Sequence, residues 1–366
     1  MNLSRRELLT ASAILLAGPR AALRAAEGTA PSADQPIVLC WNENPYGPSP
    51  AARAAVSEAI AVSCRYPDDE MHSLVSMLAA REGVSAECIV TGTGSGELLR
   101  ALGLLAARSG GEIVAAQPGY TELTHYAEGC GAKLRFVPVD ARLRHDLAAM
   151  QAAVSANTRA VYLCNPNNPT GTTIAASDIR AFVAALPDHV TTIVDEAYLD
   201  FVVAPEVTTV ADLTQGARRV VVLRTFSKIH GMAGIRCGYG IARRDVAQEL
   251  AAARMTTPNV FAVRAARASL GDHAFLTDTR KRILASRVRI TTELARLKLR
   301  YAEPQGNFVF FDTGMPLKRF TELMRARNIL VGRRFAPYDS WCRITIGTEP
   351  EVDAFLAALP AVVRQA

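Results

Sequence analysis

The chain has 366 residues and a mass of 39.3 kDa, with 49% hydrophobic and 21% charged residues. This composition is typical of a globular protein with a sizeable core and excludes a disordered or fibrous chain. The net charge is +6, reduced to about +4 outside the first 30 residues. With no run of basic residues interleaved with aromatic ones, and no apolar stretch of roughly 18 to 20 residues, we expect neither a nucleic-acid partner nor a stable membrane anchor.

Residues 1–30 differ in pattern from the rest of the chain. Arg5 and Arg6 stand just before a short apolar stretch, residues 8–18, and an alanine-rich segment with several small-residue cleavage positions follows. This order predicts a signal peptide of the twin-arginine type, with an ordinary amphipathic helix as the alternative. We therefore expect the twin-arginine machinery to export the folded protein to the periplasm.

Short apolar runs alternate with amphipathic stretches through the middle of the chain. Amphipathic patterns at residues 97–108 and 175–186 predict helices. The runs predict strands at residues 89–91, 112–116, 134–137, 160–164, 191–194, 220–223 and 238–242. Strands separated by helices indicate an α/β domain with a mostly parallel sheet.

The pattern changes after residue 270. It predicts a long basic helix, then strands and shorter helices, at residues 275–299, 307–312, 317–327, 329–331, 343–346 and from 349 onward. We interpret this region as a smaller α+β domain. The expected organisation is a signal peptide (1–30), an arm with part of the small domain (31–63), a large domain (64–270) and a small C-terminal domain (271–366).

A glycine-rich turn follows the first strand of the large domain. The segment Thr91–Glu97 leads directly into a helix, so backbone N–H groups and the helix dipole converge there, as they do at a phosphate site. It is not a dinucleotide fingerprint, because Glu97 takes the place of the third glycine. It is not a P-loop either, because no Gly-Lys-Ser/Thr follows. A bare turn without a ligand remains the alternative.

Polar residues gather where three later strands end. Asn165–Gly171 follows one strand, Asp195–Tyr198 ends the next, and Arg224–Lys228 ends the third, with Arg236 eight residues beyond the lysine. Ligands of open α/β sheets bind at this carboxyl edge. The sequence therefore predicts one site that holds an amine, a carboxylate, a phenol, an amide, hydroxyls and a guanidinium. We see no cluster with metal-ligand spacing and expect no metal.

These motifs resemble those of the aspartate-aminotransferase-like enzymes of fold type I, and within them the histidinol-phosphate aminotransferase branch. The resemblance runs from Leu39 to the end of the chain. It rests on Asn42–Pro48, Arg65–Asp68, Gly92–Glu97, Asn168–Gly171, Asp195–Tyr198, Thr225–Lys228, Gly234–Tyr239 and Cys342–Thr348. It implies pyridoxal 5'-phosphate (PLP), a homodimer with two active sites, and transfer of an amino group between an amino acid and a 2-oxo acid.

The resemblance also implies roles for individual residues. Lys228 would bind the cofactor covalently and then move the proton at the substrate Cα. Asp195 would keep the pyridine nitrogen protonated. Asn168 and Tyr198 would bind the ring oxygen, and Tyr120 would stack on the ring. The phosphate would be held by Ser95, Gly96, Thr225, Ser227, Arg236 and, from the partner subunit, Tyr66.

Three residues are candidates for substrate binding. Arg343 would clamp the α-carboxylate through a bidentate pair, and Tyr46 and Arg333 are further candidates. The branch usually has Ile-Leu-Val-Arg, but here Gly332 follows Val331, so the arginine is displaced by one residue. On a strand this shift turns the side chain to the opposite face, and only a loop distortion would restore it. We therefore expect an aromatic or other amino acid ahead of histidinol phosphate.

The sequence leaves open the role of three aromatic residues and the type of reaction. Phe335, Tyr338 and Trp341 near Arg343 indicate either an apolar side-chain pocket or part of the small-domain core. A lyase, decarboxylase or racemase on this fold would share every cofactor residue. A protein that binds the cofactor without catalysis is the remaining alternative, although such proteins normally carry an attached partner domain, and no such domain is evident here.

Overall fold

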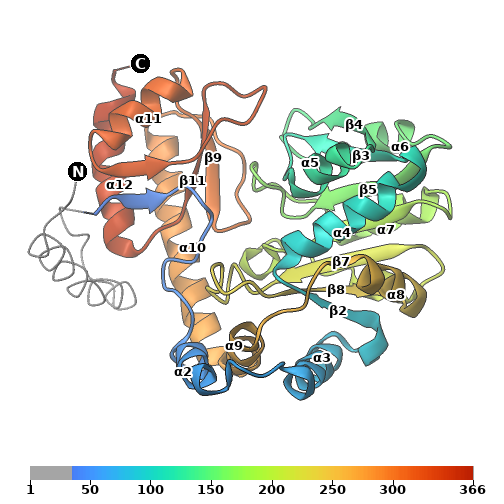
Figure 1. Cartoon of the computed structure of the whole chain (residues 1–366). Helices are drawn as coiled ribbons and strands as arrows, with labels where there is room; N and C mark the ends of the chain where they lie inside the picture. Colours follow the sequence, from blue (N-terminus) through green and yellow to red (C-terminus); the bar gives the residue numbers. More distant parts are fainter. Residues whose placement is uncertain (1–34, 366) are drawn as a thin grey trace, which may run out of the picture.

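The computed structural model of the chain describes residues 35–365. The predicted signal peptide lies outside the described residues. Within this range the chain forms a large and a smaller unit, with the small unit at the left and the large unit at the right of Figure 1. The expected α/β fold class is confirmed.

The large unit is built on a seven-stranded sheet in the order β2-β8-β7-β6-β5-β3-β4. All neighbouring pairs are parallel except those of β8, which runs antiparallel to both β2 and β7. The strands are β2 (Ile89–Gly92), β3 (Glu112–Gln117), β4 (Lys133–Pro138), β5 (Thr158–Cys164), β6 (Thr191–Asp195), β7 (Val220–Thr225) and β8 (Gly238–Ala242). The prediction of a mostly parallel sheet is therefore correct, and most strands are one or two residues longer than predicted.

Helices cover both faces of this sheet. They are α2 (Pro50–Ala59), α3 (Asp68–Glu82), α4 (Ser95–Ala107), α5 (Glu122–Gly129), α6 (Leu147–Ala152), α7 (Ala176–Ala185), α8 (Arg244–Ala253) and α9 (Val260–Gly271). Alternate strand residues face the two sides: Ala160 and Tyr162 pack with α4, α5 and α8, whereas Val161 and Leu163 pack with α3, α7 and α9. Burial on both faces explains why the strands are nearly continuous apolar runs.

The small unit combines helices with two short sheets. Its elements are β1 (Ile37–Leu39), α10 (His273–Arg296), β9 (Phe308–Asp312), α11 (Leu317–Arg325), β10 (Ile329–Val331), β11 (Trp341–Thr345) and α12 (Glu349–Val363). β1 pairs with β10 in parallel, and β11 pairs with β9 antiparallel. Thus a strand from the start of the described chain completes a unit that is otherwise built from its end (Figure 1).

Helix α10 begins earlier and ends earlier than predicted. The Asp272 side chain accepts a hydrogen bond from the backbone N–H of Phe275, which caps the helix and starts it at His273. Lys298 has a φ of 58°, a left-handed conformation that ends the helix shortly after Arg296. No helix among the described residues is long and apolar enough to cross a membrane.

Candidate active site

The carboxyl ends of β5, β6 and β7 open into a cavity of about 1050 Å³. Residues of the small unit from α11, β10 and β11 line its other side. The structure brings together all the predicted site residues except Tyr46 and Tyr66: the cavity is lined by Ser95, Gly96, Tyr120, Asn168, Asp195, Tyr198, Thr225, Ser227, Lys228, Arg236, Arg333 and Arg343. Cys40 and Arg343 also line this cavity, so the site is assembled from segments that lie up to 303 residues apart.

Lys228 lies three residues beyond the end of β7. Its Nζ donates a hydrogen bond to the backbone oxygen of Asn42, 2.9 Å away, and lies 5.3 Å from the centre of the Tyr198 ring. Burial, together with the positive charge of Arg343, lowers the pKa of Lys228 to about 8. The amine therefore loses its proton more readily than an ordinary lysine, as a nucleophile or proton acceptor must.

Asp195 is the last residue of β6 and is 2% exposed. Its Oδ1 accepts a hydrogen bond from the backbone N–H of Ala197, at 3.1 Å. Burial raises the pKa of this carboxyl to about 6, and the Ala197 hydrogen bond and Lys228 oppose that rise. The carboxylate is placed at the floor of the cavity, where it can pair with a cationic ring nitrogen.

The predicted phosphate site lies at the N-terminus of α4. Ser95 and Gly96 open the helix, whose first N–H groups have no acceptor within the helix. The guanidinium of Arg236 closes the site, with Nη1 3.4 Å from Oγ of Ser227. Gly94 has a φ of 82°, and a Cβ there would lie 2.2 Å from Arg236 Nη2, so only glycine lets the arginine approach this turn. This arrangement of N–H groups, hydroxyls and a guanidinium suits a phosphate dianion.

A connected set of hydrogen bonds forms the wall beside Lys228. Tyr198 Oη accepts hydrogen bonds from Nδ2 of Asn42, at 3.1 Å, and from Nδ2 of Asn168, at 3.4 Å. Burial raises the pKa of Tyr198 well above its usual range and that of Tyr120 to about 12, so both phenols stay protonated near neutral pH. Half-buried Tyr120 contributes its ring to the cavity.

Arg343, on β11, is 6% exposed. Its Nη1 donates to Oδ1 of Asn168 and its Nη2 to the backbone oxygen of Cys40, both at 2.7 Å. Its Nε is buried with no hydrogen-bond partner among the described residues. Arg343 lines the cavity, and a guanidinium at this position is suited to bind an anionic group of a substrate.

Arg333 also reaches the cavity, although the one-residue shift left this open. β10 ends at Val331, so the alternation of side chains along a strand no longer applies to the residues that follow. Gly332 donates its N–H to the backbone oxygen of Arg343, and a Cβ on Gly332 would lie 2.2 Å from that oxygen. Arg334 lines the cavity too, but it forms an ion pair with Asp339.

The three aromatic residues near Arg343 belong to the core rather than to a substrate pocket. Phe335, Tyr338 and Trp341 pack around the buried Phe310, with ring centroids 4.9 to 6.1 Å from it. None of the three is among the residues that line the active-site cavity. The apolar pocket considered from the sequence is therefore not formed by these residues.

Two predicted residues lie away from the cavity of their own chain. The Tyr46 ring packs against the core of the small unit, with the Arg282 guanidinium 5.2 Å from its centre. The Tyr66 side chain is 91% exposed and lies in the segment between α2 and α3. Within one chain, neither can contact a molecule bound beside Lys228.

Asn42 was not predicted to be a site residue, although the segment Asn42–Pro48 is one of the motifs on which the family resemblance rests. Asn42 has a φ of 55°, and its backbone oxygen and side chain bond to Lys228 and Tyr198 respectively. Asn is among the few residues that adopt this conformation readily, so Asn42 within a segment of turn residues was the available signal. Trp41, 65% exposed at the cavity, carried no comparable signal.

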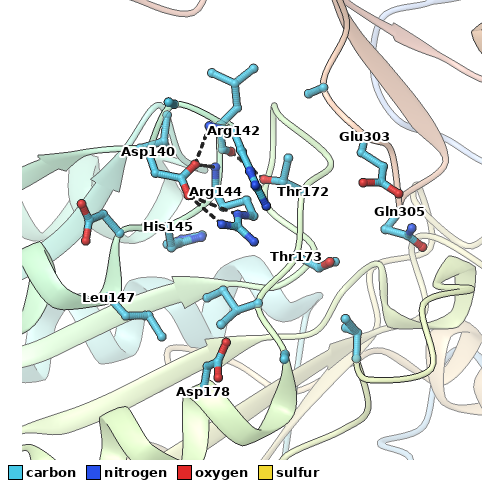
Figure 2. A pocket seen from close by; sticks show the side chains of 18 of the residues that line it. Asp140, Arg142, Arg144, His145, Leu147, Thr172, Thr173, Asp178, Glu303 and Gln305 are labelled. Carbon is cyan, nitrogen blue, oxygen red and sulfur yellow. Dashed lines mark hydrogen bonds and ion pairs between the residues drawn. The ribbon is translucent and has the colours of Figure 1, made fainter.

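A second cleft, of about 1580 Å³, lies between the two units at the loops after β4 and β5 (Figure 2). Arg144 is paired with Asp140 there, and the backbone of Arg142 donates to the same carboxylate. None of the residues that line this cleft is a lysine. The cleft therefore offers no amine for covalent chemistry, and the lysine-containing cavity is the candidate active site.

Comparisons with known proteins agree with this geometry. The family model for aminotransferase class I and II matches residues 34–359. The chain belongs to this family. It is 36% identical over 330 residues to histidinol-phosphate aminotransferase of Moorella thermoacetica (89% of this chain and 85% of that protein), and 37% identical over 326 residues to histidinol-phosphate aminotransferase 1 of Dechloromonas aromatica (88% and 89%).

A solved structure of another histidinol-phosphate aminotransferase has a similar fold. Histidinol-phosphate aminotransferase from Sinorhizobium meliloti, solved in complex with pyridoxal 5'-phosphate, superposes with a TM-score of 0.84 at 31% identity, covering 90% of this chain and 91% of that one. The protein is therefore a PLP-dependent aminotransferase, and the lyase and non-catalytic alternatives are not supported.

The residues of the cavity fit this cofactor. The N-terminus of α4 and Arg236 would hold its phosphate, Asp195 would pair with its ring nitrogen, and Lys228 would supply the amine that binds it. When bound, PLP supplies the electron sink that allows a proton to leave the substrate Cα. With the cofactor bound, the amine of Lys228 would be placed to carry the proton, the anion of Asp195 to pair with the ring nitrogen, and the guanidinium of Arg343 to orient the substrate.

Proposed function

We propose that this aminotransferase uses histidinol phosphate, or a closely similar phosphate ester of an amino alcohol, as its amino donor and a 2-oxo acid as acceptor. The observation that carries the proposal is the pair Arg333 and Arg343. Their guanidinium groups lie 4.8 and 5.1 Å from the centre of the same Phe335 ring, and both line the cavity. This reverses the preference drawn from the sequence, because Arg333 reaches the cavity and the aromatic residues do not.

The charges of this pair suit a phosphate better than a carboxylate. Histidinol phosphate carries a phosphate ester on the carbon that takes the place of the α-carboxylate of an amino acid. A carboxylate has one negative charge and a phosphate monoester has between one and two near neutral pH. Arg343 alone balances the first, whereas the second calls for another cation, and Arg333 forms no ion pair with any described residue.

An aromatic L-amino acid is the second candidate donor. Trp41 exposes 65% of its surface and lines the cavity, so it can pack against a flat side chain. The imidazole of histidinol phosphate and the ring of an aromatic amino acid suit Trp41 equally. The anionic group, rather than the ring, therefore separates the two donors.

Replacement of Arg333 tests the choice of donor. In Arg333→Ala we expect kcat/KM for histidinol phosphate to fall on the order of 10- to 100-fold, as for a lost charge-assisted hydrogen bond, with little change for L-tyrosine or L-phenylalanine. Arg334→Ala is the matched control, because Arg334 is paired with Asp339. Equal losses for all donors, or a wild-type enzyme that prefers aromatic amino acids, would reject histidinol phosphate as the substrate.

We further propose that the enzyme is a homodimer in which Tyr66 reaches the phosphate site of the partner. Tyr66 is highly exposed, and Ile60 and Met255 expose 66% and 63% of their surfaces, as apolar residues covered by a partner would in a single chain. Sedimentation should give the mass of two chains. Tyr66→Phe should weaken PLP binding while the dimer remains. A stable monomer with full activity would reject this assembly.

We also propose that the protein is exported to the periplasm by the twin-arginine machinery. Arg5 and Arg6 precede the short apolar stretch described above, and twin-arginine export carries folded proteins, which suits an enzyme that acquires PLP in the cytoplasm. Cell fractionation should find the mature protein in the periplasm with its cofactor. Conversion of both arginines to lysine should retain it in the cytoplasm, and continued export of that double variant would argue against the route.

A further inference from the structure

Tyr162 lies directly behind the carboxylate of the active site. It is on β5, 3% exposed, and its ring packs in the core between the sheet and α4. Its Oη donates a hydrogen bond to Oδ2 of Asp195, 3.1 Å away on the neighbouring strand β6. Tyr162 is not among the residues that line the cavity, so it can act on a bound molecule only through Asp195.

We propose that Tyr162 is a positioning residue that fixes the orientation of Asp195 and keeps its carboxylate ionised for the ring nitrogen of PLP. Nothing in the sequence motifs assigned it a role. Its hydroxyl and the backbone N–H of Ala197 each hold one of the two carboxylate oxygens, so the side chain cannot turn about its last bond without losing a hydrogen bond.

The environment of Asp195 explains why a donor is needed. The carboxylate is buried, and burial disfavours its charged form. A hydrogen bond from a phenol to a carboxylate stabilises the charged form. Phenylalanine at this position would fill the same space among the apolar side chains of this core but would leave Oδ2 without that donor.

The other titratable groups that face Asp195 do not take over this task. Cys164 on β5 has its pKa raised well above the usual range by burial, and its Sγ donates to the backbone oxygen of Pro166, 3.3 Å away. Tyr120 stays protonated, and Lys228 titrates near pH 8. Between pH 5 and 7, Asp195 is therefore the group among these whose charge changes.

The first test is the affinity of the cofactor-free enzyme for PLP, which needs no amino substrate and so is independent of the proposed donor. In Tyr162→Phe we expect the dissociation constant near pH 7 to rise on the order of 10-fold, and kcat to fall on the order of 10- to 100-fold with KM for the donor little changed. Tyr239→Phe is the matched control, because Tyr239 is equally buried in the same sheet and donates to Glu82.

The pH dependence separates positioning from packing. PLP binding by the wild type should weaken below about pH 6, where Asp195 gains a proton. In Tyr162→Phe this midpoint should move up by about one pH unit. A purely structural defect would weaken binding equally at every pH. An unshifted midpoint, equal to that of Tyr239→Phe, would overturn the proposal.

A double-mutant cycle gives an independent check. If Tyr162 acts through Asp195, then Tyr162→Phe should cost almost nothing further in PLP affinity when Asp195 is already Asn. Thermal unfolding of each variant, without cofactor, reports whether folding has been impaired. A loss of the same size in both backgrounds would show that Tyr162 acts independently of Asp195, and the proposal would be wrong.

Discussion

The amine of Lys228 is held by the backbone oxygen of Asn42, at 2.9 Å, across the boundary between the two units. Asn42 follows β1, which belongs to the sheet of the small unit, whereas Lys228 follows β7 of the large one. The amide nitrogen of Asn307 donates to the same backbone oxygen of Asn42 at 3.2 Å. The reactive amine is thus positioned by the small unit as well as by the strand that carries it.

Loss of the amine should abolish the covalent chemistry. In Lys228→Ala we expect the visible absorbance of the lysine-bound cofactor to disappear and kcat to fall by several orders of magnitude. Lys318 also lines the cavity, but it lies on α11 of the small unit and not at the edge of the large sheet. Lys281→Ala, an exposed lysine on α10, should behave as the wild type. Normal turnover in Lys228→Ala would refute its assignment.

The lowered pKa of Lys228 predicts how cofactor capture depends on pH. The neutral amine reacts, and burial lowers its pKa from the usual value to about 8, so the rate at which cofactor-free enzyme binds PLP covalently should rise with pH and level off above about pH 8. Arg343 is the second cause of the lowered pKa. In Arg343→Met the midpoint should therefore move to higher pH, as followed by stopped-flow absorbance. A midpoint near pH 10 in the wild type would contradict the buried position of the amine.

Arg343 should matter for every donor, since each presents an anionic group to it. Its loss removes a buried charge-assisted pair and leaves Oδ1 of Asn168 unpaired, so Arg343→Ala should cost about 2 to 5 kcal/mol in kcat/KM across a panel of donors. Arg319→Ala, an exposed arginine on α11 outside the cavity, serves as the control. A loss confined to one donor would mean that Arg343 selects side chains instead.

A substitution at Gly238 tests the predicted phosphate site at the N-terminus of α4 without altering any charge. A Cβ at Gly238 would lie 2.3 Å from the backbone nitrogen of Ser95, so Gly238→Ala should displace the start of α4 and weaken PLP binding on the order of 10-fold or more. Gly234→Ala is the matched control, because a Cβ there meets nothing within 4 Å. Equal affinities in the two variants, measured by equilibrium titration, would place the phosphate elsewhere.

Most of the fold and most of the residues of the candidate cofactor site could be predicted from the sequence. The strands could be recognised because both faces of the sheet are buried, and the chemical groups could be placed because they follow directly after those strands. The direction of the Arg333 side chain was harder to predict, because it depends on where β10 ends and on the close approach of Gly332 to the backbone of Arg343. Local periodicity does not encode either feature.

Contacts between segments far apart in the chain could not be predicted from the sequence. The N–H of Asn42 donates to Oγ1 of Thr345, 303 residues away, and the role of Asn42 beside Lys228 depends on that docking. Tyr162 looked like one more aromatic residue in an apolar strand, because its hydroxyl partner lies on another strand. Such pairings follow from packing in three dimensions, and one sequence alone gives no sign of them.

The pairing of β1 with β10 also constrains the order in which the protein can be assembled. Residues 37–39 leave the ribosome early, but their partners, residues 329–331, are among the last to be made. The large sheet can form while synthesis continues, whereas the segment that holds the reactive amine must wait for the end of the chain before it can dock. The newly made protein should therefore become competent to capture its cofactor only once translation is nearly complete.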